Sequence, residues 1–339
     1  MNIGAINNLN NLLICPNCHK ENLKISNENI LCDYCRETYP IIYGIPVLIT
    51  KKRCQELKLD YYSENYLQNI LKTENFKKNK YDVYNYIKTV LIGTNGILYK
   101  NINEPEKYPI ANVPFLKNEN LNRPLFIDIG CGWGRWVIDA ANKGYNTIGV
   151  DITLINLIIS KKILEKYQIN NCNFICCDVL NLPISSNSID IIHSFSFLQH
   201  FSEENLDIIL SSIHRIMKKN AIFKTQMVNK YSLRGIYNFY KFKNSKKNLH
   251  KGKIYFAQSD FDVRYFNIKK LNQIFSKLFE INKIENYSFF TQAQFSDFKL
   301  FKFKAKIYLI IVIAINLIAK ILPFLKNISD NLLFTLTKR

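Results

Sequence analysis

The chain has 339 residues, a formal net charge of +19 and a hydrophobic content of 47%. This hydrophobic content excludes a disordered chain, and the length suits about two folded domains. The excess of positive charge would suit nucleic acid or an anionic lipid surface as a partner. A genome rich in A and T also enriches a protein in Lys, Asn and Ile, so the charge alone identifies no partner.

The nine cysteines of the chain fall into two groups. Five have no motif spacing, and four form two CxxC pairs: Cys15, Cys18, Cys32 and Cys35. Two such pairs predict a structural Zn²⁺ site, because four thiolates complete a tetrahedral shell and leave no position for water. The first pair also reads as the haem-attachment pattern CxxCH through His19, but that reading leaves the second pair unexplained. Residues 1–11 show no export signal, so unpaired thiols predict a cytoplasmic protein.

The segment 12–49 carries a recognisable N-terminal pattern. After the cysteines it continues as Tyr-Pro-Ile-Ile-Tyr-Gly-Ile-Pro-Val-Leu over residues 39–48. The combination resembles the zinc-ribbon module of the methyltransferase-activator family. The resemblance implies that residues 1–50 form a small module that stabilises its partner domain or presents substrate, and that performs no chemistry.

Residues 51–122 are predicted to form a helical linker and cover. They are rich in Lys, Tyr and Asn, and apolar residues such as Tyr62, Tyr66 and Ile70 recur near helical spacing. Prolines at 105, 109 and 114 indicate a loop before the next domain.

From Arg123 onward, short apolar runs alternate with helical patterns, which predicts a doubly wound parallel α/β sheet. Five strands are predicted at 125–129, 146–150, 172–176, 189–193 and 221–228, and helices at 135–143, 154–167, 203–217 and 269–277. Two late strands are expected to complete the sheet. Ligands of such sheets bind beyond the carboxyl ends of the strands.

Three glycines follow the first of these strands at alternate positions: Gly130, Gly132 and Gly134. A strand that turns sharply into a helix needs residues without a Cβ, and the exposed N–H groups there suit a nucleotide-like ligand. The spacing is GxGxG. The dinucleotide pattern GxGxxG would place glycine at Arg135, so the loop argues against NAD.

Two aspartates stand at the ends of the next two strands. Asp151 is placed to accept hydrogen bonds from both hydroxyls of a ribose, since a carboxylate offers two acceptor oxygens. Asp178 could accept from the amino group of adenine, with Val179 or Leu180 packed on the ring. Either aspartate alone could simply cap a helix or turn. Their order after the glycine loop favours a nucleoside site.

These motifs together resemble class I S-adenosylmethionine-dependent methyltransferases, in particular the ubiquinone-biosynthesis-like branch. The resemblance covers about residues 123–286 and rests on Asp128-x-Gly-x-Gly-x-Gly, Gly-Val-Asp ending at Asp151, and Asp178-x-x-x-Leu-Pro. It implies a Rossmann-like sheet of seven strands whose last strand is antiparallel. It also implies that the loop from Asp128 to Gly134 holds the methionyl part, Asp151 the ribose and Asp178 the adenine.

His200 follows the fourth strand, where the resemblance places the donor methyl group. A neutral imidazole could remove a proton from an acceptor hydroxyl. The alternative is that His200 forms a local hydrogen bond or shapes the pocket, and the sequence leaves both open. Gln226, near the end of the fifth strand, is a further substrate-contact candidate.

Two segments are expected to determine which acceptor the protein methylates. Residues 229–261, with Arg234, Tyr237 and Tyr240, are predicted to form a substrate lid within a methyltransferase domain of residues 123–290. The alternative is an ordinary solvated, amphipathic insertion. The tail, 291–339, combines lysines with the apolar run 307–319, which predicts a C-terminal hydrophobic helix. At 13 residues this run is too short to span a membrane. It suits a peripheral membrane contact through 299–325 at the inner face, or packing on the sheet or on a dimer partner.

We therefore predict transfer of a methyl group from S-adenosylmethionine to a small-molecule, lipid or lipid-linked glycan acceptor, through oxygen. One alternative is a tRNA or rRNA methyltransferase, although Ser-Phe-Ser-Phe at 194–197 stands where base-methylating enzymes carry Asn-Pro-Pro-Tyr. Another is a non-enzymatic, cofactor-binding regulator.

Overall fold

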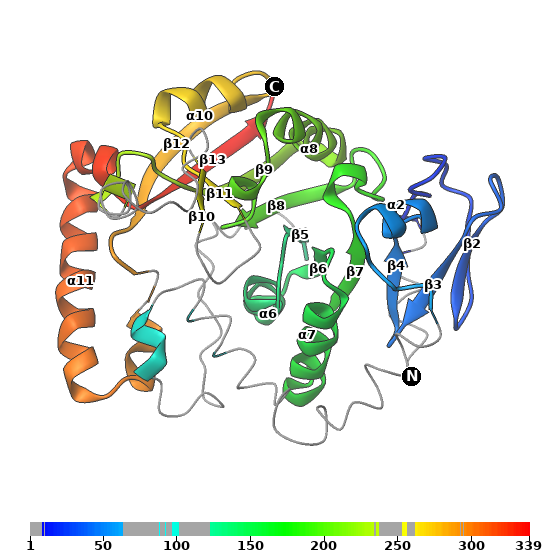
Figure 1. Cartoon of the computed structure of the whole chain (residues 1–339), viewed down its shortest axis with the longest axis horizontal. Helices are drawn as coiled ribbons and strands as arrows, with labels where there is room; N and C mark the ends of the chain where they lie inside the picture. The colour runs from blue at the N-terminus through cyan, green and yellow to red at the C-terminus, as the bar shows by residue number, and fades with distance from the viewer. Residues whose placement is uncertain are drawn as a thin grey trace. The chain divides into compact units, whose positions relative to one another are not determined.

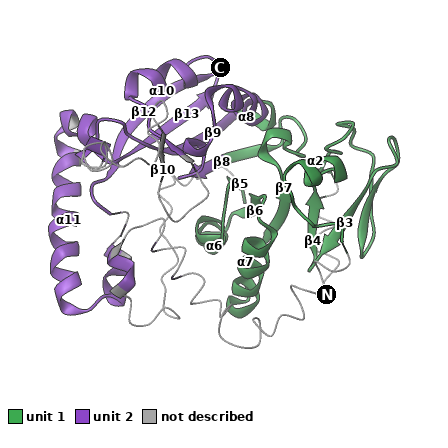
Figure 2. Cartoon of the chain, in the orientation of Figure 1, with its two compact units in different colours: residues 1–87, 110–191, 215–219 green, residues 88–109, 192–214, 220–339 purple. Residues whose placement is uncertain are grey.

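The structure is a computed structural model of the chain, and it describes residues 9, 11–63, 88, 92, 97–101, 123–233, 235–236, 253–255, 262–291, 293 and 295–339. The chain forms two compact units, shown in Figure 2. The first comprises residues 1–87, 110–191 and 215–219, and the second 88–109, 192–214 and 220–339. Most of the predicted linker, with Tyr66 and Ile70, and most of the predicted lid, with Arg234, Tyr237 and Tyr240, lie outside the described residues.

The first unit is built on a mixed sheet (Figure 1). Its strands run in the order β1-β2-β3-β4-β7-β6-β5. Their bounds are β1 Leu23–Ile25, β2 Asn29–Cys32, β3 Thr38–Ile42, β4 Ile45–Leu48, β5 Leu125–Ile129, β6 Asn146–Asp151 and β7 Cys172–Cys177. Strands β5, β6 and β7 pair in parallel, as the alternation of apolar runs and helices predicted.

The N-terminal strands are part of this sheet. β4 pairs in parallel with β7, with Val47 opposite Cys176 and Leu48 opposite Cys177. All four residues of β4 are apolar and buried, as expected for a strand that is covered on both faces. The sheet of the first unit therefore includes strands from the segment 1–50, which the sequence analysis had assigned to a separate module.

Helices cover the strands of the first unit. They are α2 (Lys51–Glu56), α6 (Arg135–Asn142), α7 (Leu154–Tyr167) and the short 3-10 helix η3 (Val179–Asn181). Under α6, a buried cluster joins Phe126, Ala140, Tyr145 and Ile191. The rings of Phe126 and Tyr145 lie 6.3 Å apart between centroids. This packing holds α6, and with it the loop that precedes the helix, against β5.

The second unit carries the remaining long strands, in the order β8-β9-β13-β12. Their bounds are β8 Ile189–Phe195, which begins in the first unit, β9 Met217–Val228, β12 Phe279–Ser288 and β13 Asn331–Lys338. β13 runs antiparallel to both β9 and β12. The unit also contains η4 (Leu198–His200), α8 (Glu203–Ile216), α10 (Ile268–Phe275) and a hairpin of β10 (Lys253–Tyr255) and β11 (Asp262–Arg264).

β13 comes from the segment 291–339, which the sequence had suggested was a tail beyond the sheet domain. The same segment forms η5 (Phe295–Leu300), α11 (Phe303–Ile321) and η6 (Pro323–Ile328), and η1 (Ile97–Asn101) belongs to the same unit. The predicted hydrophobic helix falls in α11, where the apolar run 307–319 is bounded by Lys306 and Lys320. Among the described helices, none has the length and apolarity needed to cross a bilayer.

Candidate active site

The glycine loop between β5 and α6 has the backbone that its sequence predicts. Gly130, Gly132 and Gly134 all have positive φ, at 74°, 53° and 80°. A Cβ added at Gly134 would lie 3.0 Å from the hydroxyl of Ser160, so the loop approaches α7 closely. A Cβ at Gly132 would have no atom within 4 Å among the described residues. The loop therefore combines a tight backbone with open space in front of Gly132, as a ligand cradle requires.

Asp151 holds this loop in place. Its Oδ2 accepts the N–H of Gly132 at 2.9 Å, and its Oδ1 accepts the N–H of Thr153 at 2.8 Å, just before α7 begins. Each oxygen retains a further lone pair, so the carboxylate could still accept from a ribose hydroxyl. Burial raises the pKa of Asp151 above the ordinary aspartate value, and its two backbone hydrogen bonds oppose the shift. Asp151, the residue predicted to bind the ribose, thus also fixes the glycine loop to the end of β6.

Asp178, the predicted adenine residue, is engaged by the N-terminal segment. Its Oδ2 accepts a hydrogen bond from Nε of Arg53 at 2.7 Å, and its Oδ1 accepts the N–H of Leu180 at 3.0 Å. The hydrogen bond to Asp178 raises the pKa of Arg53. Sequence reasoning missed Arg53, because 125 positions separate the two residues. Val179, predicted to pack on the adenine, is buried.

Further contacts join the segment around the cysteines to the loop after β7. The side-chain amide of Asn181 donates to the carbonyl oxygen of Pro16, and the N–H of Ile14 donates to the carbonyl of Pro183 at 3.1 Å. Tyr61 donates its hydroxyl to the carbonyl of Ile152 at 2.8 Å, next to Asp151. These residues surround the carboxyl ends of β6 and β7. The fourth predicted cofactor residue, Asp128, lies on β5 and is buried.

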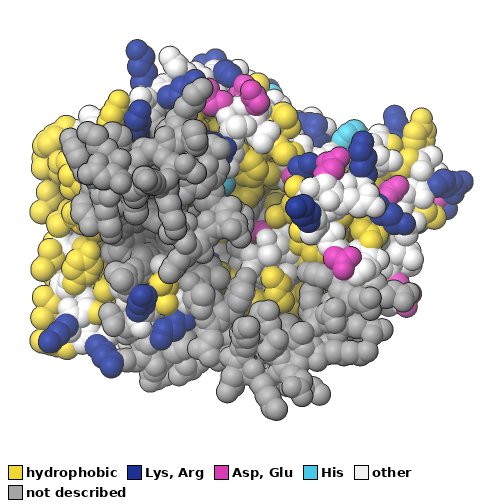
Figure 3. Space-filling view, viewed as in Figure 1, with side chains coloured by type: hydrophobic (Ala, Val, Ile, Leu, Met, Phe, Trp, Pro, Cys, Tyr) yellow, Lys and Arg dark blue, Asp and Glu magenta, His cyan; other side chains and the backbone are white. Residues whose placement is uncertain are grey.

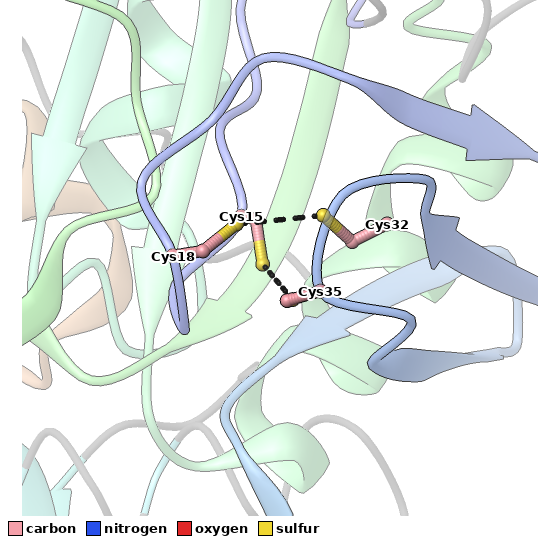
Figure 4. A group of neighbouring side chains, drawn as sticks. All are labelled: Cys15, Cys18, Cys32 and Cys35. Atoms are coloured by element: carbon pink, nitrogen blue, oxygen red, sulfur yellow. Dashed lines mark hydrogen bonds between the residues drawn. The ribbon is translucent and has the colours of Figure 1, made fainter.

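The four motif cysteines converge on one point. Their sulfur atoms all lie within 4.8 Å of one another, and Figure 4 shows the two CxxC turns facing each other. The Sγ atoms of Cys15 and Cys35 are 3.5 Å apart, and those of Cys18 and Cys32 are 3.6 Å apart. Sulfurs about 2.3 Å from a tetrahedral zinc ion would be separated by nearly this distance. The hydroxyl of Tyr39 lies 3.1 Å from Sγ of Cys15, as an outer-shell partner of a ligand would.

His200 is at the end of η4 in the second unit. Its Nε2 is 3.1 Å from the carbonyl oxygen of Ser196. A carbonyl only accepts, so Nε2 carries the hydrogen and Nδ1 is the nitrogen able to accept a proton. This is the local hydrogen bond that the sequence analysis named as an alternative to a base. The carbonyl of His200 itself accepts from the guanidinium of Arg264, on β11.

Ser196 follows β8 with a positive φ of 54°, which is unusual for a residue with a side chain. Gln226 stabilises this turn, because its Oε1 accepts both the N–H of Ser196 at 2.8 Å and its hydroxyl at 2.7 Å. The amide nitrogen of Gln226 donates to Asn331 on β13 at 2.6 Å, and Asn331 donates to Ser288 on β12 at 2.8 Å. The predicted substrate contact Gln226 is therefore fully buried and fixes the backbone beside η4. Asn331 was missed because nothing in the sequence pairs β13 with β9.

Comparison with known proteins agrees with this geometry. Residues 126–220 match the model of a family described as a methyltransferase domain. An uncharacterized protein of Methanocaldococcus jannaschii is 29% identical over 194 residues, which cover 57% of this chain and 73% of the relative. An uncharacterized methyltransferase of Synechocystis sp. is 26% identical over 99 residues, or 29% of this chain and 43% of the relative. The chain therefore spans less than half of that second relative.

A solved structure shares the fold. It is described as an S-adenosylmethionine-dependent methyltransferase of Methanosarcina mazei, and it is 16% identical, with a TM-score of 0.50. The alignment covers 67% of this chain and 99% of that one. Together the two comparisons support a methyltransferase domain over residues 126–220 and an α/β fold shared with that enzyme. The matched segment, 126–220, does not include the cysteine module, and it does not distinguish the ubiquinone-biosynthesis-like branch from other branches.

Proposed function

We propose that the protein transfers a methyl group from S-adenosylmethionine to the oxygen of a small-molecule, lipid or lipid-linked glycan acceptor. The observation that carries the donor assignment is the loop Gly130–Gly134, whose three glycines have positive φ and whose N–H at Gly132 is bound by Asp151. Such a loop at the carboxyl end of a parallel strand suits a nucleoside ligand that carries a charged amino-acid tail.

Each predicted residue then has a defined role toward the donor. The glycine loop after Asp128 receives the methionyl part, because a backbone without Cβ atoms admits close approach. Asp151 accepts from the ribose with the lone pairs that Gly132 and Thr153 leave available. Asp178 faces the adenine together with Val179, and Arg53 positions its carboxylate. When bound, S-adenosylmethionine supplies an electrophilic methyl group on a sulfonium, so the protein contributes mainly alignment.

We assign His200 as the general base for the acceptor hydroxyl. Its Nε2–H donates to the carbonyl of Ser196, which orients the ring and leaves Nδ1 as the basic nitrogen. A neutral imidazole can take up the proton of an acceptor hydroxyl at physiological pH. Gln226 acts through Ser196 as a positioning residue.

The four cysteines hold a structural Zn²⁺ ion in this proposal. Four thiolates leave no open coordination position, so the ion takes no part in methyl transfer. The ion would stabilise the two CxxC turns, and through them the pairing of β4 with β7 and the hydrogen bond from Arg53 to Asp178.

Calorimetric titration of the zinc-loaded protein with S-adenosylmethionine is the first test. Saturable binding supports the donor assignment, and no binding refutes it. The acceptor is then sought by transfer of labelled methyl into fractionated extract. Label in lipid or a small metabolite supports the proposal, label in RNA supports the RNA methyltransferase, and cofactor binding without transfer to any fraction supports a regulator.

A further inference from the structure

Helix α11 in the second unit packs through one narrow stripe. Ala305, Leu309, Val312 and Ala319 are 0–9% exposed and recur at spacings of three, four and seven residues. At the seventh-residue gap, the side-chain oxygen of Asn316 accepts the N–H of Phe289, just after β12, at 2.8 Å. Asn316, the polar residue within the apolar run, thus attaches α11 to the rest of the second unit. One side of α11 is therefore buried against the protein.

The opposite side of α11 is apolar and open. At about 100° per residue, the buried positions occupy an arc of about 80°, and the exposed apolar positions occupy an arc of about 120° centred opposite to it. The exposed residues are each 46–77% accessible: Phe303, Ile307, Ile310, Ile311, Leu317, Ile318 and Ile321. Figure 3 shows hydrophobic side chains along the edge where Figure 1 draws α11. Leu322 and Phe324 extend this surface past the end of the helix.

The exposed apolar area of α11 is large enough to indicate an interaction site. Taking about 200 Å² as the full area of a large side chain, the seven exposed residues present on the order of 800 Å² of apolar surface. The largest apolar patch on an ordinary monomer is about 300–600 Å², and larger ones indicate an interaction site. A water-facing helix would carry polar residues on this side.

The charges around the face identify the occupant. Residues 299–326 contain six lysines and no acidic residue. Lys299, Lys302 and Lys304 are exposed at the N-terminal end of α11, and Lys326 is half-buried beyond its C-terminal end. Two copies packed face to face, in either direction, would place lysines against lysines without any carboxylate between them. An anionic lipid surface instead pairs with lysines at both ends and accepts the apolar face between them.

We propose that α11 lies in the plane of a membrane surface rich in anionic lipid, with the face Phe303–Ile321 inserted among the acyl chains. The buried stripe fixes the orientation, because a helix packed on protein along one side offers only the other side to lipid. This proposal goes beyond methyl transfer and does not depend on the donor assignment, since vesicle binding requires no cofactor.

The test is flotation of the full, zinc-loaded chain with phosphatidylcholine vesicles, with and without phosphatidylserine. We expect binding to the anionic vesicles that weakens as salt increases. The double variant Ile310→Lys/Ile318→Lys should weaken that binding at least about tenfold, because two apolar anchors become charges. Lys302→Glu/Lys304→Glu should remove the preference for phosphatidylserine.

The matched control is Ile208→Lys, which places the same charge on an isoleucine of α8 that is 48% exposed. It should bind vesicles as the parent protein does, and all variants should melt at the same temperature as the parent. Equal binding to neutral and anionic vesicles, equal loss in the control, or no binding by the parent would overturn the proposal. Sedimentation that shows a dimer dissociated by Ile310→Lys, without vesicle binding, would assign the face to a second copy instead.

Discussion

Replacement of Asp151 by Asn tests the cofactor cradle directly. The carboxylate accepts two backbone N–H groups, from Gly132 and Thr153. An asparagine has only one accepting oxygen, so in either orientation its NH₂ group faces one of these N–H donors. The variant therefore loses one backbone hydrogen bond, from Gly132 or from Thr153, and one acceptor for the ribose.

The expected fall in affinity for S-adenosylmethionine is estimated from the loss of one hydrogen bond to the carboxylate. A hydrogen bond to a charged group contributes about 1.5–3 kcal/mol, and because Asp151 is half-buried we use the lower part, about 1.5–2 kcal/mol. At about 1.4 kcal/mol per decade, the affinity for S-adenosylmethionine should fall roughly 10- to 30-fold.

Calorimetric titration of the parent and variant, with melting curves for both, measures this change. Asp207→Asn is the control, because its carboxylate is 49% exposed and pairs with Lys277 on the surface of the second unit. Its affinity should match that of the parent. Gly132→Ala is a second variant, whose added methyl group would occupy the open space in front of the loop. If folded Asp151→Asn and Gly132→Ala both bind the cofactor as the parent does, the cradle is wrongly assigned.

Four further outcomes are expected. Removing metal with a strong chelator should release about one zinc ion per chain and lower the melting temperature, because structural zinc contributes folding energy; a metal-free purified protein would contradict the zinc site. Cofactor affinity should fall on acidification with a midpoint above the ordinary aspartate value of 3.8, because burial raises the pKa of Asp151 and protonation removes an acceptor; a midpoint at or below that value argues against this role. His200→Ala should reduce kcat by about 10²-fold or more with unchanged cofactor affinity, and near-normal turnover would refute the base. Gln226→Leu removes the amide oxygen that accepts the N–H and the hydroxyl of Ser196, so the free energy of unfolding measured with denaturant should fall by about 1–3 kcal/mol. An unchanged unfolding midpoint would show that water replaces the amide.

The elements around the cradle were predictable because they are local. The bounds predicted for the first strand, 125–129, and for the helix 154–167 match β5 and α7. Apolar periodicity determines such elements within a window of a few residues. The positive φ of the three glycines was predictable for the same reason, since it depends on the residue type at the turn.

Pairings between distant segments were not predictable in this way. Neither the addition of β4 to β7 nor the bond from Arg53 to Asp178 leaves a signal in one sequence, because both depend on residues more than 100 positions apart. Asp178 could be recognised from its place after a strand, but its partner could not. Gln226 was singled out for its position, and only the fold shows that its amide binds Ser196 and Asn331.

The antiparallel strand β13 has a consequence for how the chain is made. It lies between β9 and β12, yet its first residue is Asn331, whereas β9 ends at Val228. During synthesis, β9 and β12 leave the ribosome before the strand that joins them exists. Both then present unpaired N–H and C=O groups along an edge, which is a template for pairing with other chains. The second unit therefore completes its sheet late, and the interval before β13 emerges is when a nascent chain is most exposed to aggregation and to chaperones.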